Sequence, residues 1–154
     1  MTLFKGYVLS QGKKPIKKLK GGNYLDEPPE KHDYVGILRD DIIQIDFDDE
    51  DDAKKALEIV KTKKLRCSVL KTSRGIHLYF INDSHTKKQS VGIFLACGLR
   101  ADIGLGSKVR AVPLRVTKEM TTNTIVNGEE VEKVVKKTIE REWLQTYDDL
   151  DTIP

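Results

Sequence analysis

The sequence lacks the features that mark several large classes of protein. No run approaches the roughly 18 apolar residues that a membrane span needs, and no apolar segment with a small-residue cleavage site stands near the start. These absences predict a cytoplasmic protein without a membrane partner. Only two cysteines are present, Cys67 and Cys97, and their spacing matches no zinc motif. We therefore predict two buried thiols in a reducing compartment. A phosphate-binding loop of the G-x-x-x-x-G-K-[ST] type is also absent.

Charge, by contrast, is plentiful. Charged residues make up 33% of the 154 residues and hydrophobic residues 38%, which predicts one domain with a small core. The net charge of +3 is too small to identify a polyanionic partner by itself. Five of the lysines, however, fall within eight positions: Lys13, Lys14, Lys17, Lys18 and Lys20. Such a run either binds phosphates through counterion release or is a solvated segment before a turn, and both interpretations stay open.

The segment IIQIDF at residues 42–47 alternates between apolar and polar side chains, which predicts a strand. Its polar side carries Asp46 and Asp48, whose Cα atoms lie about 7 Å apart in a strand. Because neighbouring carboxylates repel, a divalent cation stabilises such a pair, and oxygen ligands suit Mg²⁺ or Mn²⁺. The acids at residues 49–52 are instead predicted to cap a helix over residues 53–64. Capping alone does not explain Asp46, which lies inside the strand.

The segment KTSRGIHLYF at residues 71–80 predicts a strand, a turn and a second strand. Alternation in the second strand places His77 on the side away from the core. A glycine at position 75 permits φ > 0, so that successive N–H groups can point at one anion. Ser73, Arg74 and His77 add donors that suit a phosphate. The alternative is an ordinary hairpin turn.

A third acid, Asp102, is predicted to end a short strand where a glycine-rich turn begins at residues 104–106. Aspartate in that position is also common turn chemistry, so Asp102 alone identifies no site. Farther along, the pair Asn127-Gly128 between β-branched runs predicts a hairpin. The segment TIEREWLQTYDDL at residues 138–150 predicts a short helix.

Taken in order, the segments IIQIDFD, TSRGIHLYF and LRADIG resemble the catalytic motifs of the archaeo-eukaryotic primase superfamily. The closest likeness is to the primase–polymerase domains of phage and plasmid replication proteins. This resemblance implies an α+β fold, a two-layer α/β core whose RNA-recognition-like antiparallel or mixed sheet is flanked by helices. It implies a single domain over residues 1–154, divided into an accessory α/β layer (1–33), a motif-bearing core (34–115) and a C-terminal hairpin and helix with the start of a linker (116–154).

The resemblance also implies a site. The catalytic residues and ligands of two Mg²⁺ or Mn²⁺ ions would be Asp46, Asp48 and Asp102. The triphosphate of a nucleotide would be held by Ser73, Arg74, Gly75 and His77, with nearby cations from Lys71, Lys108 and Arg110. Template and primer DNA would lie on a basic face that includes Lys13, Lys14, Lys17 and Lys18.

The implied activity is DNA-dependent nucleotidyl transfer, as a primase or DNA polymerase, in the replication of a phage, plasmid or other mobile element. A downstream helicase domain or protein is a further expected partner. Two alternatives remain. A catalytically weak DNA-binding or replication-initiation module would bind DNA equally well without Asp46 and Asp48. A metal-dependent nuclease could use the same acids without needing the Ser-Gly-His turn.

Overall fold

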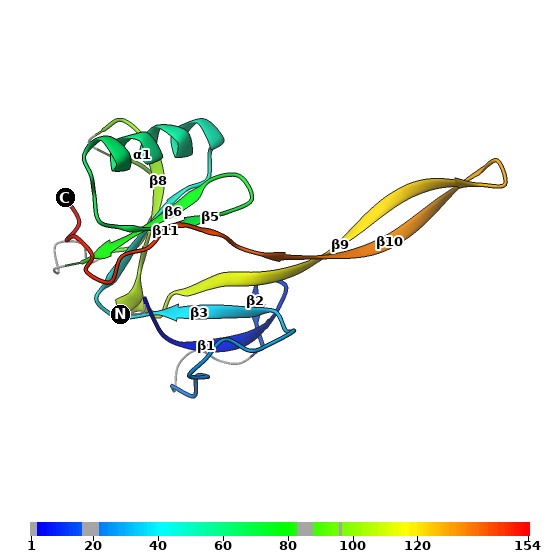
Figure 1. Ribbon diagram of the computed structural model, residues 1–154, viewed down its shortest axis with the longest axis horizontal. Helices are drawn as coiled ribbons and strands as arrows, with labels where there is room; N and C mark the ends of the chain where they lie inside the picture. Colours follow the sequence, from blue (N-terminus) through cyan, green and yellow to red (C-terminus); the bar gives the residue numbers. More distant parts are fainter. Residues whose placement is uncertain (1–2, 17–21, 83–87, 96) are drawn as a thin grey trace.

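The protein consists of two antiparallel sheets and one α-helix, as seen in a computed structural model that describes residues 3–16, 22–82, 88–95 and 97–154 (Figure 1). The five-stranded sheet has the order β10-β9-β3-β1-β2. Its strands are β1 (Phe4–Gln11), β2 (Lys14–Pro15), β3 (Tyr34–Leu38), β9 (Ala111–Val126) and β10 (Glu129–Glu140).

The second sheet has six strands in the order β11-β5-β6-β4-β8-β7. They are β4 (Ile42–Phe47), β5 (Ser68–Lys71), β6 (Ile76–Ile81), β7 (Ser90–Phe94), β8 (Arg100–Leu105) and β11 (Trp143–Gln145). Between β4 and β5 the chain forms α1 (Glu50–Thr62), and a single 3₁₀ turn (Gly106–Lys108) follows β8.

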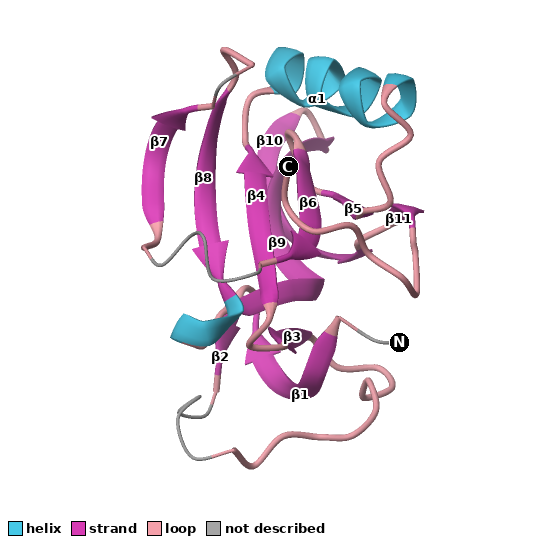
Figure 2. Ribbon diagram, turned by 90° about the vertical axis from the view of Figure 1, so that its left-hand side faces the viewer, coloured by secondary structure: helices cyan, strands magenta, loops and turns pink. Residues whose placement is uncertain are grey.

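Helix α1 packs on one face of the six-stranded sheet (Figure 2). Its N-terminus is capped by Asp49, whose side chain accepts a hydrogen bond from the backbone N–H of Asp52 at 3.0 Å. Acids in the first turn also favour the positive end of the helix dipole. The predicted capping role of residues 49–52 is therefore confirmed. The helix buries Ala53, Ala56 and Val60 against the apolar side of β4.

Alternation along β4 divides its side chains between two cores. Ile43, Ile45 and Phe47 join the core beneath α1, whereas Ile42 joins a second core between the two sheets. That second core contains Phe4 from the five-stranded sheet. The polar side of β4 therefore faces the other sheet, and it is not an open solvent face.

The hairpin at Asn127-Gly128 forms as predicted. Both residues have positive φ, 53° and 79°, which a tight two-residue turn between twisted antiparallel strands requires. The turn joins β9 to β10, and the two strands pair along twelve positions. Beyond the reach of β3 they form a two-stranded arm that projects away from both sheets (Figure 1).

Several expectations about the fold are wrong. The predicted antiparallel sheet with helix is present, but the described residues contain one α-helix, so two sheets with a helix on one face are found where helices were predicted to flank one sheet. Residues 138–150 form the end of β10 and then β11, because Trp143 pairs with Leu70 and its ring packs against those of Phe4 and Tyr79. The described part of residues 1–33 contributes strands and no helix. None of the helices that the structure describes is long and apolar enough to cross a membrane.

The two cysteines differ in exposure. Cys67 is fully buried in the core beneath α1, and burial raises the pKa of its thiol to about 12. Cys97 is exposed, contrary to the expectation that both thiols are buried. Composition predicts how often a residue type is buried, but the fold decides which copy of it is buried.

Candidate active site

Three residues from separate motifs lie in one row across the six-stranded sheet. Asp46 on β4 is directly opposite His77 on β6 and, on its other side, directly opposite Asp102 on β8. Residues opposite each other in antiparallel strands share a face, with Cβ atoms about 4.5–5.5 Å apart. Asp102 lies inside β8, and Gly104 also belongs to the strand, so the turn predicted at residues 104–106 begins two residues later, at Gly106. Position within the strand is what aligns Asp102 with Asp46.

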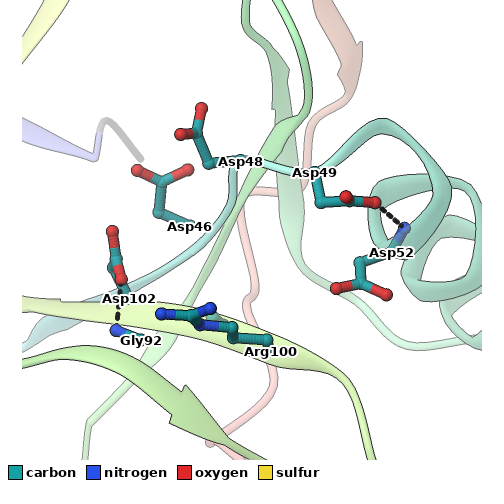
Figure 3. Close-up of a pocket in the computed structure, with 8 residues that line it drawn as sticks. Asp46, Asp48, Asp49, Asp52, Gly92, Arg100 and Asp102 are labelled. Carbon is teal, nitrogen blue, oxygen red and sulfur yellow. Dashed lines mark hydrogen bonds between the residues drawn. The ribbon is translucent and has the colours of Figure 1, made fainter.

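The predicted carboxylates line one cleft of about 360 Å³. Figure 3 shows Asp46, Asp48 and Asp102 around this acid cleft, with Arg100 at its rim. The carboxylate of Asp48 accepts a hydrogen bond from Nη2 of Arg74 at 3.2 Å. The carboxylate of Asp102 accepts one from the backbone N–H of Gly92 at 2.6 Å. Arg74, predicted to contact a phosphate, is therefore paired with a predicted metal ligand.

The acid cleft fits a divalent cation in its chemistry. Carboxylate oxygens are the donors that Mg²⁺ and Mn²⁺ prefer. Among the described residues, no three acidic, histidine or cysteine side chains are gathered closely enough to hold an ion. The Asp48 carboxylate is bonded to Arg74, and the Asp102 carboxylate to the N–H of Gly92. Exposed ion pairs are weak, so an entering cation needs to displace only the Arg74 contact to recruit Asp48.

His77 belongs to a buried polar network. Its side chain lies between the sheets, and its Nδ1 is 2.9 Å from the hydroxyl of Tyr79. That hydroxyl donates to Oε1 of Gln44 at 2.9 Å, while Nε2 of His77 faces Oδ1 of Asp46 at 3.4 Å. The prediction that His77 lies away from the core is wrong, because the second sheet covers this face. The network fixes the ring and leaves Nε2 as the nitrogen directed at the acid cleft.

Replacing Tyr79 by Phe is expected to lower the free energy of unfolding by about 2 kcal/mol. The substitution removes one hydroxyl and leaves two buried groups, on His77 and Gln44, without their shared partner. Urea unfolding monitored by circular dichroism measures the change, with Tyr147→Phe at an exposed tyrosine as the matched control. Unfolding midpoints that agree for Tyr79→Phe and wild type would contradict the buried network.

Gly75 is required for a reason other than the one predicted. It is not among the residues with positive φ in the described chain. Instead, a Cβ at this position would lie 1.7 Å from the carbonyl oxygen of Phe47. Its N–H already donates to Oγ1 of Thr72 at 3.1 Å, so it is not free to bind an anion. The glycine lets the turn before β6 pass close to the end of β4, beside Asp48.

A second cleft, called the cation cleft because four cations and two glutamates are among its ten lining residues, lies between the β5–β6 turn and the base of the arm. It is lined by Lys13, Lys71, Thr72, Ser73, Val116, Lys118, Ile139, Glu140, Arg141 and Glu142. Of the predicted nucleotide-binding residues, Lys71 and Ser73 therefore line this cation cleft and not the acid cleft. Lys13, predicted to bind DNA, lies here as well.

Arg141, like Lys118, is a cation of this cleft that the sequence analysis did not predict. It is half-buried, its Nη1 has no hydrogen-bond partner, and burial lowers the pKa of its guanidinium. Partial burial, followed by the cations Arg141 and Lys118, lowers the pKa of Lys13, whereas Asp48 raises it. The two clefts lie close together, because Ser73 lines the cation cleft while its neighbour Arg74 is hydrogen-bonded to Asp48 of the acid cleft. No sequence signal marks Arg141, because it comes from a segment predicted to be helical.

The remaining predicted residues are scattered. Arg110 packs over Gly104, and its buried Nε has no hydrogen-bond partner. Lys108 is exposed in the 3₁₀ turn beyond the end of β8, and it lines neither cleft. Lys14 is exposed in β2, while Lys17 and Lys18 lie outside the described residues.

Comparison with protein-family models, curated proteins and solved structures finds no match to this chain. A functional assignment therefore depends on the geometry. The two features that bear on it are the row across the six-stranded sheet and the adjacent acid and cation clefts.

Proposed function

We propose that this protein is a metal-dependent nucleotidyltransferase of the primase–polymerase kind, acting on DNA in the replication of a mobile element. The main support is the row in which Asp46 stands between Asp102 and His77, one residue from each sequence motif. If the resemblance of the three motifs were accidental, there would be no reason for them to lie together on one face of one sheet. The order of the first elements is also consistent with this proposal, because β4, α1, β5 and β6 form the β-α-β-β part of an RNA-recognition-like arrangement.

The acid cleft suits the divalent cations of the reaction, and the cation cleft suits the triphosphate of the nucleotide. Asp46, Asp48 and Asp102 would hold the divalent cations, which supply activation of the attacking hydroxyl and charge neutralisation of the leaving pyrophosphate. The cation cleft binds the triphosphate through Lys13, Lys71 and Arg141. The α-phosphorus then lies between acids and cations, where positioning and charge compensation account for most of the rate.

The role of His77 follows from its surroundings. Because Nδ1 is bonded to Tyr79, only Nε2 faces the acid cleft, where it meets Oδ1 of Asp46. His77 therefore presents Nε2 toward Asp46, where this nitrogen can contact either the Asp46 carboxylate or a group bound in the acid cleft. For the triphosphate to contact Nε2 of His77 directly, it must extend past the Asp46 carboxylate.

Replacing Arg141 by Met is expected to weaken binding of a nucleoside triphosphate about tenfold, because one hydrogen bond between charged groups is lost. The protein should remain at least as stable as wild type, since a half-buried guanidinium with an unpaired Nη1 is removed. Titration calorimetry with a nucleoside triphosphate and Mg²⁺ measures the affinity, and Lys55→Met on the exposed side of α1 is the control. Unchanged affinity in the Arg141 variant would remove the cation cleft from the nucleotide site.

The activity itself is tested by incorporation of labelled nucleotides on a DNA template, with and without a primer, in Mg²⁺ and in Mn²⁺. Template-dependent extension or primer synthesis is the expected result. Shortening of labelled DNA without synthesis would favour a nuclease. DNA binding that is unaffected by loss of Asp46 and Asp48, with neither synthesis nor cleavage, would favour a non-catalytic module.

A further inference from the structure

Apart from Lys118, which lines the cation cleft, the arm formed by β9 and β10 takes no part in the site just described. Over residues 118–137 it is a two-stranded ribbon of nine paired positions, from Lys118 opposite Lys137 to Val126 opposite Glu129. Every residue in this stretch is exposed. Strand β3 pairs with β9 only as far as Arg115, so no third strand among the described residues supports the ribbon. Figure 1 shows it extending far from both sheets.

Such a ribbon exposes more surface than a compact chain can account for. The protein exposes 10,179 Å² at a mass of 17.5 kDa, whereas a compact monomer of that mass exposes about 7,900 Å². The excess over the whole chain is about 2,300 Å², and the arm, in which every residue from 118 to 137 is exposed, contributes to it. Isolated two-stranded ribbons are marginally stable in water. The arm also exposes large apolar side chains, including Val131 at 43% and Val135 at 41%. These properties indicate that another surface covers the arm.

The charge of the arm is divided along its length. The four paired positions nearest the turn carry Glu129, Glu130 and Glu132 and no cation, a net charge of −3. The next five positions carry four lysines against one glutamate, a net charge of +3, from Lys118, Glu119, Lys133, Lys136 and Lys137. The tip of the arm, at the turn, is therefore acidic, and its base, the end next to the sheets, carries a positive charge of equal size.

We propose that the arm is a dimerisation element that lies antiparallel against the arm of a second copy of this chain. A two-fold axis through the middle of the paired arms places each acidic tip on the basic base of the other. When the two β10 strands pair edge to edge in this alignment, Glu129 and Glu130 of one arm lie opposite Lys137 and Lys136 of the other. The same alignment sets Val131 of one arm opposite Val135 of the other, which covers exposed apolar surface.

A nucleic acid is a poorer occupant of this surface. Phosphates are repelled by the three glutamates at the tip, which is the part of the arm that reaches farthest. The lysines gather near the base, beside the cation cleft that Lys118 also lines. A second copy satisfies both ends of the arm at once, whereas a polyanion satisfies only one. This inference does not depend on the proposed nucleotidyl transfer.

Charge exchange tests the proposal in the full-length chain. One variant reverses the base, Lys136→Glu with Lys137→Glu, and a second reverses the tip, Glu129→Lys with Glu130→Lys. Each variant alone sets like charges against one another in the antiparallel alignment, so its dimer should dissociate at least about tenfold more readily than the wild-type dimer. An equimolar mixture of the two variants restores every opposite-charge contact and should form a mixed dimer. Sedimentation equilibrium under reducing conditions measures the dissociation of each variant and of their mixture. A double variant of α1, Lys54→Glu with Lys55→Glu, is the control.

Wild-type dimers that weaken at high salt, together with the mixed dimer, would support the proposal. A wild-type chain that stays monomeric at every concentration would overturn it. Dimers that persist unchanged in both single variants would also overturn it, because the interface would then lie elsewhere. Binding to duplex DNA is measured as well. If the wild type is monomeric and the Lys136→Glu, Lys137→Glu variant loses DNA binding, the arm binds nucleic acid instead.

Discussion

Replacing Asp46 by Asn is expected to lower the rate of nucleotide incorporation at least about 1,000-fold, or about 4 kcal/mol in transition-state stabilisation. Asp46 is the central member of the row, with Asp102 on one side and His77 on the other. The change removes one negative charge from the ligand set but keeps the size of the side chain. A neutral amide is a weak ligand for Mg²⁺ or Mn²⁺, so the loss acts directly on the cations that the reaction requires.

Primer-extension rates at saturating nucleotide measure this effect. The matched control is Asp51→Asn, an exposed acid in the first turn of α1 that does not line the acid cleft. Circular dichroism checks that both variants are folded. Retention of wild-type incorporation by a folded Asp46→Asn variant would refute the metal site and the proposed activity together.

Replacing Gly75 by Ala is expected to lower the free energy of unfolding by about 3 kcal/mol, since the added methyl group meets backbone and not a movable side chain. Its Cβ would lie 1.7 Å from the carbonyl oxygen of Phe47, 2.8 Å from the carbonyl carbon and 3.3 Å from Cα of Asp48. The strand end must therefore move, and Asp48 moves with it. We expect a melting temperature about 6–12 °C lower than that of wild type, together with reduced incorporation.

Thermal unfolding followed by circular dichroism measures the first effect, and Ser73→Ala in the same turn is the control. Ser73 is exposed, so its loss should leave the melting temperature unchanged. If Gly75 served instead as a flexible anion-binding turn, alanine would weaken nucleotide binding and leave stability nearly intact. A melting temperature within about 1 °C of wild type would therefore contradict the close approach to Phe47.

Local patterns in the sequence were enough to predict several elements. Period-two alternation in residues 42–47 predicts a strand, and acids before an apolar stripe predict a capped helix. The pair Asn127-Gly128 predicts a tight turn, because both residues tolerate positive φ. Each of these features depends on residues close together in the chain, so the physical cause of each is present in the segment itself.

The helix predicted over residues 138–150 shows where local reasoning ends. The segment has an apolar spacing compatible with a helix, but the arm directs it back across the six-stranded sheet. Pairing of Trp143 with Leu70 and ring contacts with Phe4 and Tyr79 then outweigh a weak helical preference. Contacts that override propensity come from distant parts of the chain and leave no mark in the segment.

The sequence by itself determined which side of β4 carries Asp46, because side chains in a strand alternate whatever surrounds them. Only the tertiary structure decided what that side faces. Strand register places Asp102 and His77 beside Asp46, and the second sheet buries His77 that alternation alone left in solvent. The same packing brings Arg141 and Lys13 into one cleft from opposite ends of the chain. Register and sheet packing are set by the sum of many long-range contacts, and no single segment of sequence contains that sum.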